Sequence, residues 1–441
     1  MGKETTSHII KNYGDIDTDV HGLRLVDSLE QSLRRLTPER VMEKATRGIQ
    51  SKLGKGKTVV IGFGKASFGM FLGLSKNLGD RAESSSVIIP ENLQIKGSVS
   101  GLKVLRAPHP VPDERTIKAS RSLMEGIGKF QEEDNVIVLI SGGSSSLFEL
   151  PARDIDIDLI RYVTSTMMDR GSDIMDLNRM RQVMSSVKGG KLAARLWPAK
   201  VLVYIISDVP GDDPSFIGSG PVTFTQITEG EIDSILQKYD LDRDSRTREI
   251  MDKFDYSFPD KNKFRHIRTK IVLKNHDFVR VITASLRKGN QRVLDLGSGL
   301  GGDVQTVANS LSDSMEKLSG LYERDTWFVG GGETTVNVKG KGIGGRNQEL
   351  AVRFAMEMRD KEMEYAFMSA GTDGIDGSSD AMGGIVCSSA FEKLDPDQVA
   401  EYLKNNDTGT LLKIKNMAMI SGATGNNVSD VFAGFIGRKK R

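Results

Sequence analysis

The sequence has very little cysteine, since Cys387 is the single thiol among 441 residues. An intrachain disulfide is therefore excluded, and so few thiols are typical of a reducing compartment, expected here to be the cytoplasm. Residues 1–13 are polar and lack the apolar core of a secretion signal. No apolar run approaches the roughly 18 residues that a membrane-spanning helix needs, so no membrane partner is expected.

A dominant charge is lacking as well. Lys and Arg number 61, Asp and Glu number 59, and the net charge is +2. Because this balance creates no strong field that would attract nucleic acid, we expect no nucleic-acid partner. The chain has 5 histidines, and none has the spacing of zinc ligands. One of them, His109, stands in a proline-rich loop and could face a site.

Glycine is abundant instead, and its 47 residues fall in clusters, which indicates ligand loops rather than disorder. The densest cluster, residues 330–350, ends in Gly-Gly-Arg-Asn-Gln-Glu-Leu, and an apolar helix-like run follows. Glycine N–H groups can approach a ligand closely, and a helix start offers further N–H groups to an anion. Arg346 adds a planar, permanently charged fork that suits carboxylate or phosphate. The stretch therefore predicts a site for a small anion.

Short apolar runs alternate with helix-like segments after a helical start over residues 17–53. The expected strands are Thr58–Ile61, Ser86–Ile89, Val136–Ile140 and Val201–Ile206, then a second series of Ile271–Leu273, Val293–Leu296, Trp327–Val329 and Tyr365–Met368. Runs this short and apolar favour parallel strands buried on both faces, and the helices between them imply β-α-β units. We predict an α/β protein of two α/β domains, the first with a Rossmann-like, mainly parallel sheet.

Residues 224–265 are polar, charged and helical in pattern, so we interpret them as the connection between the domains. This interpretation assigns residues 1–250 to an N-terminal Rossmann-like domain and residues 265–441 to a C-terminal domain. It leaves open whether the last helix packs back on the first domain.

Two glycine loops follow strands of the first series, where ligands bind in open α/β sheets. In Gly62-x-Gly64-Lys65, a lysine beside a helix start is unfavourable unless an anion joins it, so Lys65 is predicted to contact phosphate or carboxylate. The alternative is a tight turn with an exposed lysine. The loop Ser141–Ser146 has the donors to hold phosphates, with a simple helix cap as the alternative. A serine nucleophile is disfavoured because the last glycine of Gly-x-Ser-x-Gly is absent.

Further loops carry acids or glycines. Asp208 and Asp212 follow a very apolar strand, where carboxylates can hold Mg²⁺, although an ordinary turn is the alternative. The segment 188–190, Lys-Gly-Gly, is either an anion site or a helix break. The loop 371–377 contains Asp373 and is either a ligand contact or an acidic turn.

The run Val293–Gly301 matches the strand-to-loop motif of methyltransferases that use S-adenosylmethionine. That interpretation would leave the other glycine loops unexplained. It also places the motif past the midpoint of the chain. A turn that caps a helix over residues 303–318 is favoured instead.

Eight motifs occur together in a fixed order. They are Gly62–Ala66, His109–Glu114, Ser141–Ser145, Lys188–Ala193, Ser207–Pro221, Gly331–Leu350, Ala370–Gly377 and Thr424–Asp430. In this order they resemble the glycerate 2-kinase family, the glycerate kinases with a MOFRL-type C-terminal domain. The sequence departs from the family at residues 296–302, which are less acidic than usual, and at Asn426-Asn427.

The resemblance implies transfer of phosphate from ATP to the 2-hydroxyl of D-glycerate, giving 2-phosphoglycerate and ADP, as in carbohydrate metabolism of the Entner–Doudoroff type. It also implies an active site in the interdomain cleft, with the family's catalytic lysine at Lys65 and its arginine at Arg346. A homodimer is left open. The alternatives are a kinase of another small hydroxy acid, a nucleotide-binding regulator without turnover, and a methyltransferase.

The expected roles follow from the chemistry of phosphoryl transfer. Lys65 and Arg346 are the expected catalytic cations, and Asp208 and Asp373 are the alternative bases. Asp208 and Asp212 are expected to hold Mg²⁺ or another divalent cation. The expected substrate contacts are Lys65, Arg346, Asn347 and Glu333. The expected nucleotide and phosphate contacts are Ser141, Gly142, Gly143, Ser144, Ser145, Lys188, Gly189, Gly190, Gly218, Ser219 and Gly220.

Overall fold

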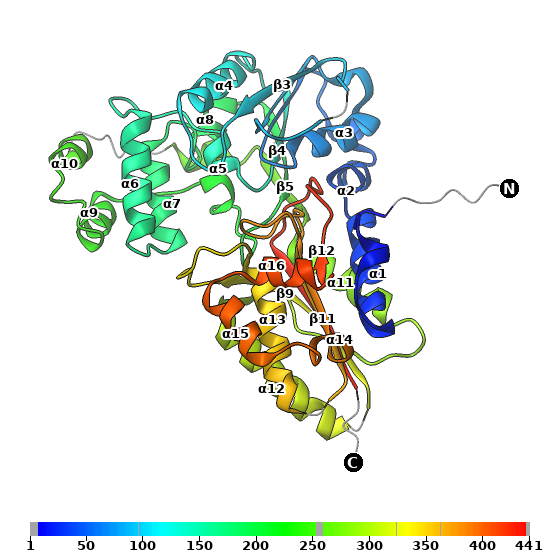
Figure 1. Cartoon of the computed structure of the whole chain (residues 1–441). Coiled ribbons are helices and arrows are strands. Elements are labelled where there is room, and N and C mark those ends of the chain that lie inside the picture. The colour runs from blue at the N-terminus through cyan, green and yellow to red at the C-terminus, as the bar shows by residue number, and fades with distance from the viewer. Residues whose placement is uncertain (1–7, 96, 253–258, 323, 362, 438–441) are drawn as a thin grey trace. The chain divides into compact units, whose positions relative to one another are not determined.

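Two sheets organise the chain in the computed structural model, which describes residues 8–95, 97–252, 259–322, 324–361 and 363–437. The parallel-sheet unit comprises Pro38–Leu273, and the mixed-sheet unit comprises Met1–Thr37 together with Lys274–Arg441 (Figure 1). The polar segment 1–13 considered above is described only from residue 8.

The parallel-sheet unit has six strands in the order β3-β2-β1-β4-β5-β6, all parallel. They are β1 (Thr58–Phe63), β2 (Ser84–Pro90), β3 (Leu102–Ala107), β4 (Asn135–Ile140), β5 (Lys200–Ile206) and β6 (Ile267–Leu273). This order confirms the Rossmann-like prediction. The central strands β1 and β4 are buried at every position, as the continuous apolar runs predicted.

Helices cover both faces of this sheet (Figure 1). They are α2 (Pro38–Ala45), α3 (Ser67–Leu78), α4 (Glu114–Glu125), α5 (Ser144–Leu147), α6 (Ile157–Asp169), α7 (Ile174–Met184), α8 (Lys191–Leu196), α9 (Glu229–Lys238) and α10 (Ser245–Asp252). One core lies between the sheet and helices α4 and α8, and α6, α7 and α9 share a second core. The 3₁₀ turn η4 (Ile217–Ser219) follows β5.

The mixed-sheet unit contains strands in the order β12-β11-β10-β13-β9-β7, with β8 beside β9. They are β7 (Val293–Asp295), β8 (Leu300–Asp303), β9 (Thr326–Thr335), β10 (Tyr365–Gly371), β11 (Gly383–Cys387), β12 (Ala418–Met419) and β13 (Asp430–Ile436). The expectation of parallel strands is wrong here for β10, because β10 runs antiparallel to both β13 and β11. A continuous apolar run indicates that a strand is buried on both faces. Helices on the two faces of a sheet bury a strand in this way whether it runs parallel or antiparallel to its neighbours.

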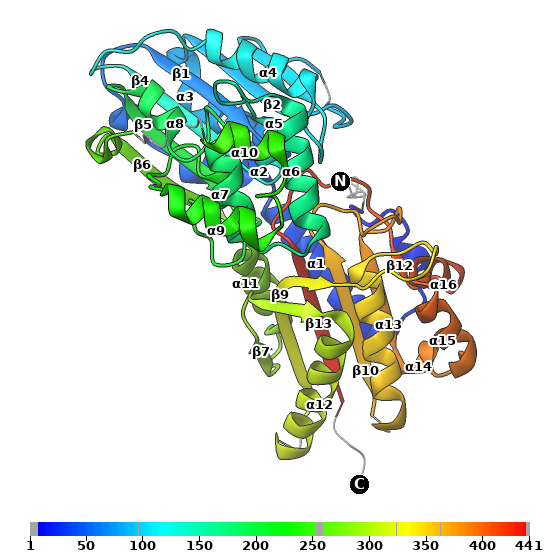
Figure 2. The same cartoon turned by 90° about the vertical axis from the view of Figure 1, so that its left-hand side faces the viewer.

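Helices α12 and α13 lie against one face of this sheet, and α1 and α11 lie against the other (Figures 1 and 2). The helices of this unit are α1 (Val20–Arg35), α11 (Asn275–Leu286), α12 (Val304–Tyr322), α13 (Arg346–Met358), α14 (Ser388–Phe391), α15 (Pro396–Lys404) and α16 (Thr408–Ile414). The last helix, α16, packs on α13 and α15 of its own unit.

The contacts divide the chain differently from the boundaries expected at residues 250 and 265. Helix α1 belongs with the second sheet, since His21 stacks on Phe435 of β13 with ring centroids 3.7 Å apart. The expected strand 271–273, placed in the second series, is the end of β6 and pairs with β5 of the first sheet. Residues 224–265 lie within the parallel-sheet unit, with 253–258 outside the described part.

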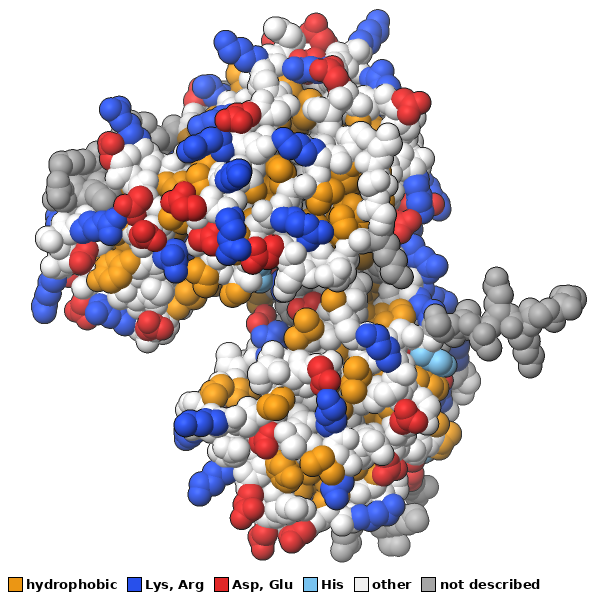
Figure 3. Space-filling model, turned by 45° about the horizontal axis from the view of Figure 1, so that its top comes forward, with side chains coloured by type: hydrophobic (Ala, Val, Ile, Leu, Met, Phe, Trp, Pro, Cys, Tyr) orange, Lys and Arg blue, Asp and Glu red, His pale blue; other side chains and the backbone are white. Residues whose placement is uncertain are grey.

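Charges of both signs are interspersed on the face shown in Figure 3, in keeping with the balanced composition. Among the described helices, none is both long enough and apolar enough to cross a bilayer.

Helices α2 and α3 pack closely at Gly73, where a Cβ atom would lie 2.1 Å from the carbonyl oxygen of Glu39. We predict that Gly73→Ala lowers the thermal midpoint, because the two helices must separate, at a cost of roughly 1–3 kcal/mol. Circular dichroism measures the change. Gly230→Ala in α9, where a Cβ would meet no atom within 4 Å, is the matched control and should be neutral or stabilising. Equal midpoints for Gly73→Ala and the wild type would contradict the close packing.

Candidate functional site

The strand order of the first sheet reverses between β1 and β4, and the two loops that follow these strands are bonded together. The backbone N–H of Lys65 donates to the carbonyl of Gly142 at 2.9 Å, and that of Ala66 donates to Ser141 Oγ at 3.0 Å. Gly64 has φ +123°, and a Cβ there would lie 2.3 Å from Ser141 Oγ, so this approach requires glycine. Lys65 is thereby held, half-buried, at the point where open α/β sheets bind ligands.

Some hydroxyl groups of the serine loop 141–146 form hydrogen bonds within the loop itself. Ser144 Oγ donates to the Ser141 carbonyl at 2.7 Å, and both side chains are buried. Ser145 Oγ instead lies 3.2 Å from Ser219 Oγ, which joins this loop to the turn η4. A Cβ on Gly143 would lie 2.8 Å from His109 Nε2 and 3.4 Å from Lys65 Cγ, so both side chains flank this glycine.

The segments 188–190 and 218–220 run side by side. Gly189 N donates to the Ser219 carbonyl at 3.1 Å, and Gly190 N donates to the Gly220 carbonyl at 2.8 Å. Lys188 is fully buried and forms an ion pair with the buried carboxylate of Glu149. Burial lowers the pKa of Lys188, although Glu149 favours the charged form. Phosphate contacts by these groups stay a prediction, and in this structure their donors engage protein partners.

Asp208 and Asp212 lie on one turn after β5, and Asp212 adopts φ +57°. Within the described ranges, no group of three or more His, Cys, Asp or Glu side chains is arranged to hold a metal ion. Two carboxylates still fit Mg²⁺, which takes its remaining ligands from water and substrate phosphates. The magnesium site at Asp208 and Asp212 therefore stays a prediction.

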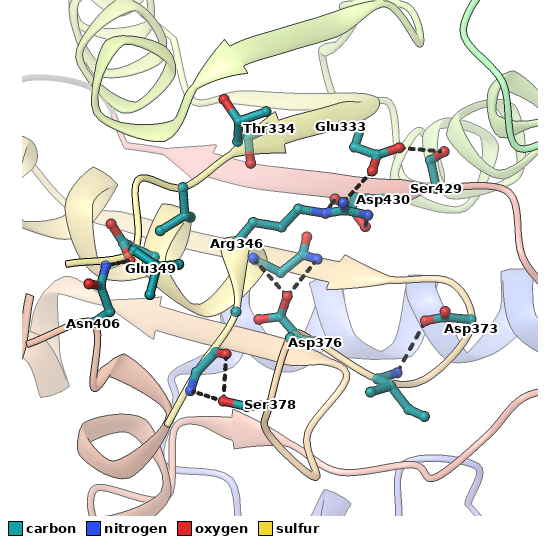
Figure 4. A pocket seen from close by; sticks show the side chains of 18 of the residues that line it. Glu333, Thr334, Arg346, Glu349, Asp373, Asp376, Ser378, Asn406, Ser429 and Asp430 are labelled. Carbon is teal, nitrogen blue, oxygen red and sulfur yellow. Dashed lines mark hydrogen bonds and ion pairs between the residues drawn. The ribbon is translucent and has the colours of Figure 1, made fainter. Parts of the chain in front are cut away.

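The arginine pocket, a cavity of about 690 Å³, lies entirely in the mixed-sheet unit. Its charged lining residues are Glu333, Arg346, Glu349, Asp373, Asp376 and Asp430 (Figure 4). Strand β13 begins at Asp430, which pairs in register with Gly332 of β9 and Gly371 of β10. Three strand ends and the start of α13 therefore meet at this pocket. It gathers four sequence-predicted residues: Arg346, Asn347, Glu333 and Asp373.

Arg346 is held by two carboxylates (Figure 4). Its Nε lies 2.5 Å from Asp430 Oδ2, its Nη2 lies 3.1 Å from Asp430 Oδ1, and its Nη1 pairs with Glu333. Burial opposes the charge of Arg346, but Asp430 and Glu333 outweigh it and the pKa of the guanidinium is raised. Burial raises the pKa of Asp430 to about 6, although Arg346 favours its ionised form.

The start of α13 differs from the prediction of free N–H groups for an anion. Asp376 Oδ1 accepts from Asn347 N at 3.0 Å, and Asp376 Oδ2 accepts from Gln348 N at 2.8 Å. A Cβ on Gly345 would lie 2.4 Å from this carboxylate, so the loop 371–377 approaches closely only because residue 345 is glycine. The chain's own aspartate thus occupies part of the anion position at this helix start.

The other predicted residues of the pocket differ in exposure. Asn347 is buried and binds Asp376 and Ser369 through its side-chain amide. The side chain of Glu333 is 42% exposed, and Asp373 is half-buried, with Oδ1 accepting from Ile375 N. Glu333 and Asp373 are therefore more accessible to a ligand than Asn347.

Sequence reasoning did not assign Asp430, Asp376 or Glu149 to the site. Asp430 and Asp376 were present in the motifs 424–430 and 371–377, and an acid at a strand end was the available signal. Nothing near Glu149 in the sequence indicated its pairing with Lys188, which lies 39 positions away.

The methyltransferase-like run forms two short strands, β7 and β8, that both pair with β9. The loop at residues 296–299 therefore leads from strand to strand rather than from strand to helix. The helix expected over residues 303–318 is α12, but β8 and not the glycine turn leads into it, and Asp303 caps it by accepting from Gln305 N at 3.0 Å and Thr306 N at 3.1 Å.

Known proteins match both parts of the chain. Residues 24–252 match a domain of unknown function (DUF4147), and residues 326–430 match the MOFRL family. A glycerate 2-kinase of Picrophilus torridus is 38% identical and covers 97% of this chain and 99% of its own length. A D-glycerate 2-kinase of Thermotoga maritima is 34% identical and covers 93% of this chain and 97% of its own length. A crystal structure of a glycerate kinase from Thermotoga maritima aligns with TM-score 0.82 at 30% identity, covering 93% of this chain and 98% of that one.

The two-unit α/β fold and these matches define a kinase. The chain belongs to the glycerate 2-kinase family with a MOFRL domain, as the eight motifs predicted.

The raised pKa of Asp430 predicts how stability depends on pH. Folding raises this pKa from 3.8 to about 6, so the folded protein binds the proton more tightly than the unfolded chain. The carboxyl therefore destabilises the folded state increasingly as pH rises from about 4 to about 6. We predict that the thermal midpoint of the wild type minus that of Asp430→Asn falls across this window and is level above it.

Thermal unfolding followed by circular dichroism at half-unit pH steps measures this difference. Asp380→Asn is the matched control, because Asp380 is exposed and Lys413 lowers its pKa. Any pH dependence of the thermal midpoint that Asp380 causes therefore lies below about pH 4. A difference for Asp430→Asn that is flat or rising between pH 4 and 6 would contradict the prediction.

Proposed function

We propose that this kinase transfers the terminal phosphoryl group of ATP to the 2-hydroxyl of D-glycerate, giving 2-phosphoglycerate and ADP. The observation that carries the proposal is the similarity over 97% of the chain to a protein named glycerate 2-kinase. The Rossmann-like strand order adds support, because Lys65 and the serine loop lie at its reversal, where such sheets bind nucleotides and other ligands.

Phosphoryl transfer needs positioning and charge neutralisation more than covalent chemistry. In our scheme the loops 141–146, 188–190 and 218–220 surround the phosphates of ATP. Lys65 neutralises charge on the transferring group, and Arg346 binds the carboxylate of D-glycerate or that same group. Asn347 and Glu333 complete the substrate contacts.

Mg²⁺ would be held by Asp208 and Asp212 and would supply charge neutralisation to the phosphate oxygens. The proton of the 2-hydroxyl passes to Asp208 or Asp373. Asp373 lines the arginine pocket with Arg346, whereas Asp208 follows β5 of the parallel-sheet unit. Asp373→Asn tests the assignment, because loss of the base lowers kcat and changes its pH profile, whereas Asp208→Asn would also remove a proposed Mg²⁺ ligand. An unchanged kcat and pH profile in Asp373→Asn would leave Asp208 as the base.

The product identifies the reaction. We expect D-glycerate, ATP and Mg²⁺ with the purified protein to yield the phosphorus NMR signal of 2-phosphoglycerate. A signal of 3-phosphoglycerate would contradict the proposed regiochemistry. Transfer to hydroxypyruvate or tartronate but not to D-glycerate would assign a different small acid as the acceptor.

We predict that Lys65→Ala and Arg346→Ala each lower kcat by about 10² or more, because each removes a cation that faces transition-state charge. A coupled assay of ADP release measures kcat. Lys44→Ala, which removes an exposed lysine of α2, is the control and should retain wild-type turnover. Near-normal turnover in both test variants would contradict the scheme.

A further inference from the structure

Arg346 retains donors for a ligand in the arginine pocket, although two carboxylates hold it. Asp430 accepts from Nε and Nη2, and Glu333 accepts from Nη1 (Figure 4). Within the described ranges the Arg346 side chain makes no other hydrogen bond. Each terminal nitrogen of a guanidinium carries a second N–H group, so Nη1 and Nη2 keep one donor each. The side chain is 34% exposed, and this pair of donors suits a bidentate carboxylate.

The arginine pocket has an excess of negative charge. Five carboxylates line it, and Arg346 is the one cation among the described residues of the lining. Asp430 already neutralises Arg346, and Asp376 accepts from the start of α13. Glu349 pairs with Arg353, which lies outside the lining. A ligand with one negative charge therefore fits this pocket better than a ligand with two or more.

Glu333 is the accessible one of the two carboxylates on Arg346. Its side chain is 42% exposed, whereas that of Asp430 is 9% exposed. Because Glu333 contacts Nη1, a carboxylate bound by Nη1 and Nη2 lies beside it. The two ends of a three-carbon acid are close together, so the far end of such a ligand also lies near Glu333. A hydroxyl group there can donate to Glu333, but a second carboxylate is repelled.

We propose that Glu333 determines which small hydroxy acid the arginine pocket accepts. The substrate is a monoanion whose carboxylate binds Arg346 and whose terminal hydroxyl group donates to Glu333, and a dicarboxylate of the same length is rejected. This inference rests on the proposed function and specifies the class of its acceptor. D-Glycerate and tartronate are the matched pair of ligands, because tartronate has a carboxylate where D-glycerate has a hydroxymethyl group. Like charges placed side by side supply the discrimination.

Glu333→Gln tests the proposal, because the substitution removes the charge but keeps an oxygen that accepts a hydrogen bond. Isothermal titration in the presence of ADP measures Kd for D-glycerate and for tartronate. We expect the wild type to bind D-glycerate at least about tenfold more tightly than tartronate, and Glu333→Gln to reduce this ratio by about tenfold. Both acids lose repulsion beside Arg346, but only tartronate loses it at a second carboxylate, so the ratio is the measure.

Two further variants separate the charge of Glu333 from its place in the fold. Glu333→Asp keeps the charge and should keep the preference for D-glycerate. Glu401→Gln, which removes an exposed carboxylate of α15 outside the pocket lining, is the matched control and should keep the wild-type ratio. Circular dichroism of Glu333→Gln should show a thermal midpoint close to that of the wild type, because Asp430 still holds Arg346.

An unchanged ratio in Glu333→Gln would overturn the inference, as would equal binding of the two acids by the wild type or binding of neither. The titration needs no turnover. A wild type that prefers D-glycerate but transfers no phosphate to it would therefore overturn the proposed function while supporting the role of Glu333.

Discussion

Burial of Asp430 at the start of the central strand β13 is the constraint on which the arginine pocket depends. The register of β13 between β9 and β10 fixes this carboxylate beside Glu333 and the end of β10. Arg346 reaches it from the start of α13, and Asp376 holds that helix start from another loop. A buried charge that loses its partner is strongly unfavourable, so the strands, the loop and the helix have to assemble together.

Much of the first sheet could be predicted because its central strands carry their evidence locally, whereas the central strand β13 of the second sheet was not predicted. Strands β1 and β4 are continuous apolar runs bounded by polar turns. The edge strands β3 and β6 have exposed polar positions such as Arg106 and Lys270, and the first was missed while the second was placed in the wrong sheet. The direction of β10 depends on pairing with β13, and no local pattern reports a partner that far away.

The sequence located the glycine loops but could not reveal which of their donors are already engaged. Lys188 has a typical anion-site sequence, yet Glu149 pairs with it in the protein interior. The start of α13 has the glycines of an anion site, yet Asp376 takes two of its N–H groups. In both cases the partner is a carboxylate from a distant segment, which only the folded chain brings into contact.

Helix α1 is synthesised long before the strands and the helix on which it packs. This helix buries Leu25, Val26 and Leu29, and it packs on α11 and on strands β10 and β13, which emerge from the ribosome only after Lys274. The parallel-sheet unit is continuous from Pro38 to Leu273, so it can fold before the sheet that packs on α1 has been synthesised. During most of translation, the apolar face of α1 therefore has no sheet of its own unit to cover it.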